Sequence, residues 1–332
     1  MVATAKCRPA QRRRRSVSME LKSAASSILA SSLALKEGEK FLVVTDPDRR
    51  RIGEALFEAG AELGAEAALA VMLPREANGE EPPEHVAAAM AAADVVVVPT
   101  THSLTHTRAR LQAVERGARV ATMPGITEDM FREGAITADY VEVERLTKRV
   151  AAALDSAREA LVVTGSHRLR MSVEGRNAVA STGVHREPGR SGNLPSGEAF
   201  LAPVEGTSEG ELLVDGSIAG VGRLSESVLL KISEGMLASA SGQEGERLLD
   251  LLDGFPKGRS VAELGVGTND RARLTGVTLE DEKIYGTIHI AFGSNDTFGG
   301  TVAAGVHLDA VVLEPELYLD DRLVVGQGLV HI

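Results

Sequence analysis

The chain has 332 residues, 43% of them hydrophobic and 25% charged, which is the balance of a globular protein long enough for two domains. A formal net charge of −11, 3% aromatic residues and no tryptophan argue against nucleic-acid binding. The single cysteine leaves no disulfide framework, and no apolar run approaches the ~20 residues of a membrane span. We therefore expect a cytoplasmic protein without nucleic-acid or membrane partners.

The only basic block of the chain lies at its start. It contributes six positive charges with no acidic residue among them: Lys6, Arg8 and Arg12 to Arg15. Without these six charges the remainder carries −11 − 6 = −17. Such a like-charged block does not form a packed core, so we predict a disordered basic tail over residues 1–18.

Apolar and amphipathic segments alternate regularly between residues 19 and 158. The sequence predicts strands and helices over these ranges: strands at 41–45, 67–73, 94–99 and 118–123, and helices at 50–63, 84–92 and 105–116. This alternation is typical of a doubly wound parallel sheet. We therefore predict a Rossmann-like α/β domain over 19–158. No Gly-x-Gly-x-x-Gly follows the first strand, so we expect no dinucleotide cofactor there.

The pattern changes in the second half of the chain. Short apolar strands are separated by glycines and by turns such as Asp215-Gly216, with one helical segment at 242–252. Hairpin turns of this kind favour antiparallel or mixed strands. The sequence predicts a β-rich, mixed α+β domain over 159–332.

Ionisable residues gather in this second domain between Glu263 and Asp309. They are embedded in apolar runs and comprise Glu263, Glu282, His289, His307 and Asp309. His307 and Asp309 are two residues apart, so on a strand they would share a face. Burying such groups unpaired is costly, and two imidazoles with several carboxylates suit Zn, Mn, Co or Fe(II). The cluster predicts a metal-binding centre, with a buried polar network as the alternative.

Four segments resemble those of the thermophilic metallo-aminopeptidases, the aminopeptidase T and S family. Asn193–Phe200 resembles that family's Asn-x-Pro-x-x-Glu-x-Phe, and Glu263–Asn269 its Glu-x-x-x-Gly-Thr-Asn. Residues 281–293 resemble its Asp-Glu-Asn…His-x-Ala-x-Gly, and residues 307–309 its His-x-Asp. The resemblance implies a two-metal centre of Zn, Co or Mn with these ligands: Glu198, Glu263, Glu282, His289, His307 and Asp309.

The resemblance also implies the activity of an aminopeptidase, a metalloprotease that acts in proteolysis. In this hydrolase a metal-activated water would cleave the N-terminal residue from small peptides with a free N-terminus. Glu198 and Glu263 would be the catalytic carboxylates, as metal bridge or general base, and the protein would be a homodimer. The chain departs from the family after His289, because Ser294-Asn295-Asp296 stands where the peptidases carry a tyrosine.

Two other interpretations use the same scaffold. The superfamily also includes 2,5-dihydroxypyridine dioxygenases of similar short length, in which His289, His307 and Asp309 would hold one Fe(II) for ring cleavage. Glu198 and Glu263 would then support the ligands or act as acid–base groups. The third interpretation is a catalytically silent protein that kept the scaffold and binds a metal or another ligand.

Overall fold

The computed structural model describes residues 9–332, with side chains from Met19 onward, and comprises two compact units. The first contains residues up to Thr137 together with Val184–Leu194, and the second contains Ala138–Gly183 and Pro195–Ile332. The division falls at residue 137, whereas the sequence placed the boundary at 158. The difference is helix α6 (Tyr140–Ser156), which packs against strands of the second unit.

The first unit is built on a parallel sheet with strand order β2-β1-β3-β4-β8. The strands are β1 (Lys40–Thr45), β2 (Glu66–Val71), β3 (Val95–Thr100), β4 (Arg119–Pro124) and β8 (Ser191–Asn193). Every residue of β3 is buried, as expected for a central parallel strand covered on both faces. The predicted doubly wound sheet is confirmed.

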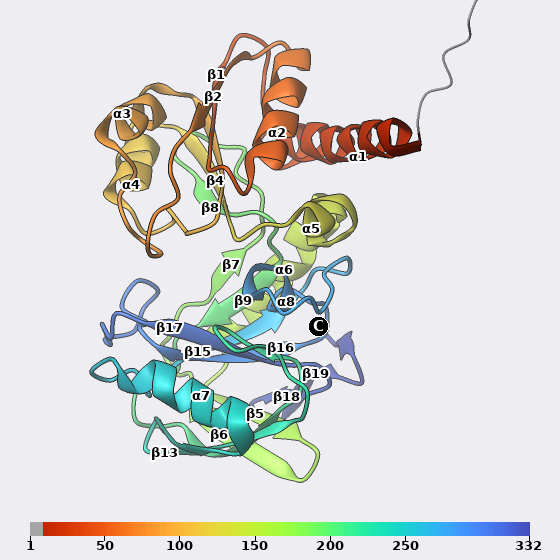
Figure 1. Cartoon of the computed structure of the whole chain (residues 1–332). Coiled ribbons are helices and arrows are strands. Elements are labelled where there is room, and N and C mark those ends of the chain that lie inside the picture. Colours follow the sequence, from red (N-terminus) through yellow and green to blue (C-terminus); the bar gives the residue numbers. More distant parts are fainter. Residues whose placement is uncertain (1–8) are drawn as a thin grey trace, which may run out of the picture. The chain divides into compact units, whose positions relative to one another are not determined.

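Helices cover both faces of this sheet. They are α1 (Pro9–Ser31), α2 (Arg50–Glu62), α3 (Glu84–Ala92), α4 (Arg108–Glu115), α5 (Glu128–Glu133) and the short 3-10 helix η1 (Ala135–Thr137). Helices α1 and α2 pack together on one side, and α3 and α4 on the other (Figure 1). None of the helices within residues 9–332 combines the length and apolar character that crossing a membrane requires.

Helix α1 corrects the prediction for the N-terminal tail. Residues 9–18 were expected to be disordered, but they form the first turns of α1; residues 1–8 lie outside the described part of the chain. Buried residues recur at helical spacing further along α1: Leu21, Ala25, Ile28 and Leu29. Once this apolar stripe anchors the helix, each added turn costs little, and arginine is a good helix former. The helix therefore extends into the basic block.

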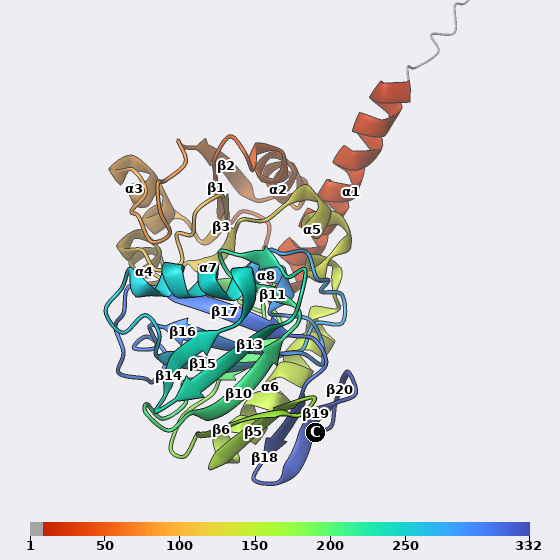
Figure 2. The same cartoon turned by 60° about the horizontal axis from the view of Figure 1, so that its bottom comes forward.

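The second unit contains two antiparallel sheets that share one hydrophobic core with α6 (Figure 2). The seven-stranded sheet, in the order β12-β11-β17-β16-β15-β9-β7, contains β7 (Val179–Ser181), β9 (Glu198–Leu201), β11 (Ser217–Ile218), β12 (Gly222–Arg223), β15 (Val261–Gly267), β16 (Ile288–Gly293) and β17 (His307–Val312). The predicted β-rich, mixed α+β architecture is confirmed.

The eight-stranded sheet has the order β14-β13-β10-β6-β5-β18-β19-β20. Its strands are β5 (Glu159–Thr164), β6 (His167–Ser172), β10 (Glu209–Val214), β13 (Val228–Ser233), β14 (Met236–Ala240), β18 (Glu316–Leu319), β19 (Arg322–Gly326) and β20 (Leu329–Val330). Helix α7 (Gly242–Asp253) packs against β13 and β14, and the short helix α8 (Thr278–Asp281) precedes β16.

Candidate metal centre

The seven-stranded sheet is apolar on one face and ionisable on the other. Successive side chains of a strand point to opposite faces, so residues two apart share a face. One face of β15, β16 and β17 joins the core: Leu264, Val266, Ile288, Ile290, Phe292, Ala310 and Val312. The other face carries the predicted ligands Glu263, His289, His307 and Asp309, and Glu198 begins the adjacent strand β9. The alternation within these strands brings the ligands onto one surface.

Small residues stand across the strands from the ligands. The register pairs Glu263 and Asp309 with Ala291, His289 with Gly265, His307 with Gly293, and Glu198 with Gly267. A Cβ on Gly265 would lie 2.0 Å from Nε2 of His289, so the imidazole lies directly over the Gly265 backbone. Because glycine and alanine have little or no side chain, they leave space on this face of the sheet in which the ligand side chains converge.

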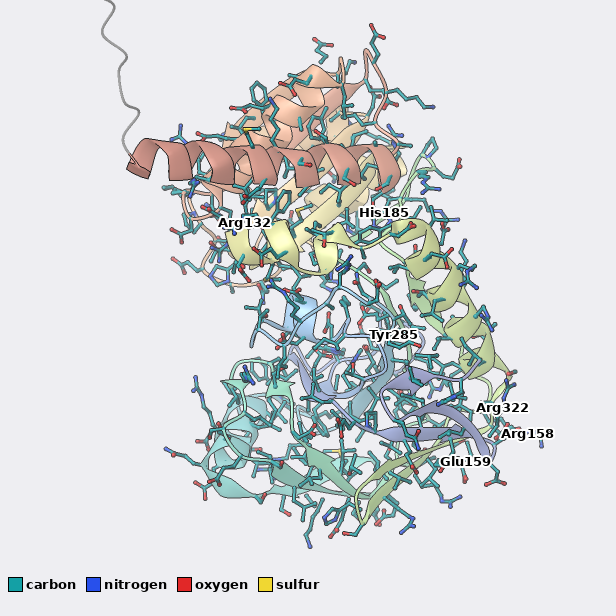
Figure 3. All side chains as sticks on the ribbon, turned by 90° about the vertical axis from the view of Figure 1, so that its right-hand side faces the viewer. Arg132, Arg158, Glu159, His185, Tyr285 and Arg322 are labelled. Atoms are coloured by element: carbon teal, nitrogen blue, oxygen red, sulfur yellow. The ribbon has the colours of Figure 1, made fainter. Side chains whose placement is uncertain are left out.

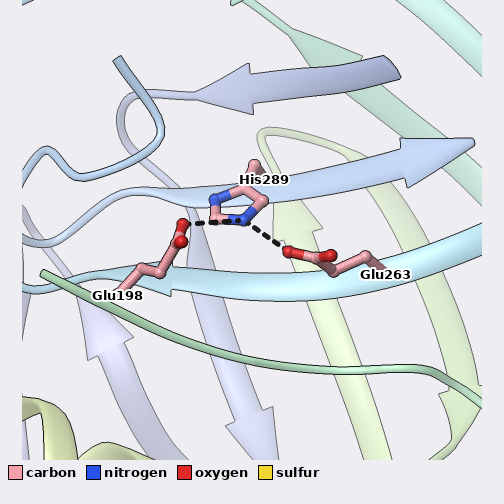
Figure 4. A group of neighbouring side chains, drawn as sticks. All are labelled: Glu198, Glu263 and His289. Atoms are coloured by element: carbon pink, nitrogen blue, oxygen red, sulfur yellow. Dashed lines mark hydrogen bonds and ion pairs between the residues drawn. The ribbon is translucent and has the colours of Figure 1, made fainter. Parts of the chain in front are cut away.

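His289 lies between two glutamates (Figure 4). Its Nε2 is 3.0 Å from Oε1 of Glu263 and 3.6 Å from Oε2 of Glu198. Burial disfavours the imidazolium, but the hydrogen bond to Glu263 and the charge of Glu198 outweigh it and raise the pKa of His289 to about 9. Within the described residues, Nδ1 of His289 and Oε2 of Glu198 are buried without a hydrogen-bond partner. Buried polar atoms of this kind usually have a partner, such as an ordered water or an ion.

His307 and Asp309 form the second part of the centre. Nε2 of His307 is 3.4 Å from Oδ1 of Asp309 and 3.4 Å from Oε2 of Glu263. Burial disfavours the imidazolium, but Asp309 outweighs it and raises the pKa of His307 to about 10; His307 in turn holds the pKa of the buried Asp309 well below its usual range. Because a divalent cation competes with this proton for the same atoms, metal binding would release it.

A buried lysine, which the sequence did not predict as part of the site, completes the cluster. Nζ of Lys283 is 2.7 Å from Oε1 of Glu198 and also forms an ion pair with Glu282, and its side chain is fully buried. Burial raises the pKa of Glu282 to about 8 despite the adjacent ammonium. Charged residues in a short helical turn are usually exposed. In the sequence, only the position of Lys283 within the segment that resembles Asp-Glu-Asn pointed to a place near the site.

The structure brings all six predicted ligands together in three overlapping groups, within which the ligand atoms lie within 4.8 Å of one another. These groups are Glu198–Glu263–His289, Glu263–His307–Asp309 and Glu282–His289–Asp309. None of these groups of described residues contains both histidines, so the predicted His289–His307–Asp309 triad is not one of them. Nitrogen and oxygen donors without sulfur suit a divalent metal such as Zn, Mn or Fe(II).

Tyr285 does not replace the tyrosine of the peptidases in this arrangement. The hydroxyl of Tyr285, which is labelled in Figure 3, accepts a hydrogen bond of 3.1 Å from the N–H of Val330 in β20. Ser294, which occupies the region of the missing tyrosine, has a different role. Its carbonyl oxygen accepts a 2.8 Å hydrogen bond from Nδ1 of His307, which leaves Nε2 directed at the carboxylates.

Two phenylalanines lie beside the most exposed ligand. The side chain of His307 is 31% exposed, whereas those of Glu263 and Asp309 are 7% and 9% exposed. Phe298 stacks edge-to-face on His307 with ring centroids 5.9 Å apart, and Phe200 stacks on Phe298 at 5.3 Å. The side of the centre that reaches solvent is therefore aromatic.

Several known proteins are similar to this chain in sequence or in fold. The family model described as 2,5-dihydroxypyridine 5,6-dioxygenase (NicX) matches residues 25–332. The 2,5-dihydroxypyridine 5,6-dioxygenase of Pseudomonas putida KT2440 is 31% identical over 171 residues, which span 46% of this chain and only 47% of that relative's length.

Two solved structures share the fold. The 2,5-dihydroxypyridine dioxygenase of Pseudomonas putida KT2440 superimposes with a TM-score of 0.80 at 23% identity, over 95% of this chain and 97% of that one. AmpT of Thermus thermophilus superimposes with a TM-score of 0.69 at 17% identity, over 95% and 99%. At these identities the superpositions show the fold alone.

These findings correct the predicted activity. The prediction of a metallo-aminopeptidase, and with it of a hydrolase acting in proteolysis, is wrong, because the matching family and the curated relative are dioxygenases. The motifs that carried the resemblance contain the candidate metal ligands, and one scaffold can support different reactions. The homodimer and the absence of nucleic-acid and membrane partners stay predictions.

Proposed function

The chain belongs to the 2,5-dihydroxypyridine 5,6-dioxygenase family, and we propose that it uses O₂ and one Fe(II) to open a dihydroxylated pyridine ring. The observation that supports this most directly is the group Glu263, His307 and Asp309 at the solvent-facing side of the cluster. One imidazole and two carboxylates would hold the ion and leave positions for substrate and O₂, whereas the usual facial triad of non-haem iron oxygenases has two histidines and one carboxylate.

The ligand geometry prepares these side chains for a cation. The Ser294 carbonyl holds His307 in the orientation that presents Nε2, at 3.4 Å from both Glu263 and Asp309. Ferrous iron bound there would supply the one-electron chemistry through which O₂ reacts with an electron-rich ring. The protein orients these ligands and keeps them buried, except that His307 is partly exposed.

The aromatic side of the centre would hold the substrate ring. Phe298 packs edge-to-face against His307, and Phe200 packs edge-to-face against Phe298. A flat heteroaromatic molecule packs favourably on such surfaces. Glu198 faces His289 and Lys283, so we assign it the role of positioning His289.

The proposed reaction is balanced without a further reductant. In 2,5-dihydroxypyridine, the substrate that the relative's name gives, the bond between C5 and C6 breaks. Each of these carbons receives one atom of O₂, so C5 becomes a carboxylic acid and C6 becomes a formyl group on the ring nitrogen. All electrons come from the substrate.

Oxygen uptake tests the proposal. Metal-free protein loaded with Fe(II) under anaerobic conditions, then mixed with 2,5-dihydroxypyridine and ¹⁸O₂, should consume O₂ and substrate in equal amounts. Both heavy oxygen atoms should enter the product, and the ring absorbance should disappear. Protein loaded with Zn(II) is the control, since zinc has no redox chemistry. Protein that binds Fe(II) yet leaves both ring and O₂ unchanged would overturn the proposal.

A further inference from the structure

The ammonium of Lys283 lies inside the ligand cluster. It bonds to Glu198 at 2.7 Å and pairs with Glu282, and its side chain is 0% exposed. A buried charge is tolerated only when it is paired, so both carboxylates are engaged by this lysine. Each of them also belongs to a candidate metal group that contains His289. Lys283 therefore competes with a metal for the His289 side of the cluster.

One buried asparagine holds the lysine and its partner in place. The backbone N–H of Asn269 donates to the carbonyl of Lys283 at 2.9 Å. The side-chain amide of Asn269 donates to the carbonyl of Ser196 at 2.7 Å, two residues before Glu198. Asn269 therefore ties the backbone of Lys283 to the segment that precedes Glu198.

We propose that the ammonium of Lys283 takes the place of a second divalent cation, so that the cluster binds one metal, at Glu263, His307 and Asp309. The inference rests on the metal site of the proposed function. A second divalent cation on the His289 side would have to displace the ammonium from its two carboxylates or bind against it. Like charges repel strongly where burial reduces screening. The lysine thus sets the number of metals, and with it the class of chemistry that the scaffold supports.

Metal stoichiometry tests this inference without any activity assay. Metal-free protein is titrated with Mn(II), and bound metal is measured by equilibrium dialysis and by electron paramagnetic resonance. The wild-type protein should saturate at about one Mn(II) per chain, and Lys283→Met at about two, with the spin coupling of neighbouring ions in a two-metal site. Lys231→Met is the matched control, because Lys231 forms an exposed ion pair with Glu211, and it should saturate as the wild type does.

Every result decides the question. Saturation of the wild type at one ion supports the inference, and saturation at two overturns it. A folded Lys283→Met variant that still binds one ion also overturns it. If that variant does not fold, Lys283→Gln, which keeps a hydrogen-bond donor toward Glu198 but removes the charge, is measured in its place, and one ion per folded chain of it overturns the inference. A wild type that binds one ion and opens no ring would overturn the proposed function and leave this inference standing.

Discussion

The imidazole of His307 is anchored by the backbone of Ser294: Nδ1 donates a 2.8 Å hydrogen bond to a carbonyl 13 residues earlier in the chain. A carbonyl only accepts, so this bond fixes the proton on Nδ1 and leaves Nε2 available. The segment that lacks the tyrosine of the peptidases therefore orients one of the candidate metal ligands.

Replacing His307 with alanine should remove both metal and activity. The loss in metal affinity should exceed the ~10–100-fold that removal of a ligand's supporting partner typically costs. Elemental analysis after dialysis and oxygen uptake measure the two effects. His331→Ala is the control, since the imidazole of His331 bonds the backbone carbonyl of Gly326 near the C-terminus, and this variant should bind metal normally. Normal iron content in folded His307→Ala would contradict the assignment.

Gly265→Ala should displace His289. The new methyl group would lie 2.0 Å from Nε2, and overpacking of this kind costs about 1–3 kcal/mol of stability. We expect a lower melting temperature and weaker metal binding together. Gly254→Ala provides the comparison, because its nearest neighbour is 4.0 Å away, and it should leave both properties unchanged. Equal behaviour of the two variants would contradict the close packing of His289 on Gly265.

The metal-free protein should lose stability as the pH rises above neutrality. The pKa values of His289 and His307 are raised to about 9 and 10 in the folded chain, against ~6.5 when unfolded. A raised histidine pKa gives stability that is complete below the unfolded value and lost as pH rises through the folded value. The raised pKa of Glu282, about 8, acts in the same direction between its unfolded value and pH 8.

Thermal unfolding between pH 6 and pH 10 measures this effect. The melting temperature of the metal-free protein should fall across the range, and His307→Gln should reduce the slope because one of the titrating groups is gone. Saturating metal should also flatten the curve, since the ion replaces the protons. A melting temperature of the metal-free wild type that rises toward pH 10 would contradict the prediction.

Phe298→Ala should weaken substrate binding more than turnover. An aromatic pair contributes about 0.5–1.5 kcal/mol, which corresponds to a roughly 2- to 10-fold higher KM. Oxygen-uptake kinetics at varied substrate concentration separate KM from kcat. Phe57→Ala, which removes a partly buried ring of helix α2 in the first unit, should leave KM unchanged. An unchanged KM in Phe298→Ala would exclude this ring from the substrate site.

Local patterns predicted much of the fold. The run Val95–Val98 indicated a buried strand, and the spacing of His307 and Asp309 placed both on one face of β17. Strand β8 was not predicted, because Ser-Gly-Asn has no apolar periodicity and its pairing with β4 depends on residues about 70 positions away. The burial of Lys283 likewise depends on Glu198, 85 positions earlier.

The chemistry was harder to predict than the site. Glu263, His307 and Asp309 were identified as ligands from residue types that suit zinc, manganese and iron alike. A water-activating metal and an oxygen-activating metal use similar donors, so the motif could not separate the hydrolase from the oxygenase. The family match over residues 25–332 made that distinction.

The return of the chain to the first unit at Val184–Leu194 has a consequence for synthesis on the ribosome. Strand β8 completes that sheet only after 46 residues of the second unit, Ala138–Gly183, have been translated. Until then β4 is an open sheet edge, which can pair with other chains. A truncated polypeptide ending at residue 137 should therefore aggregate, whereas one that extends past residue 194 can close the edge.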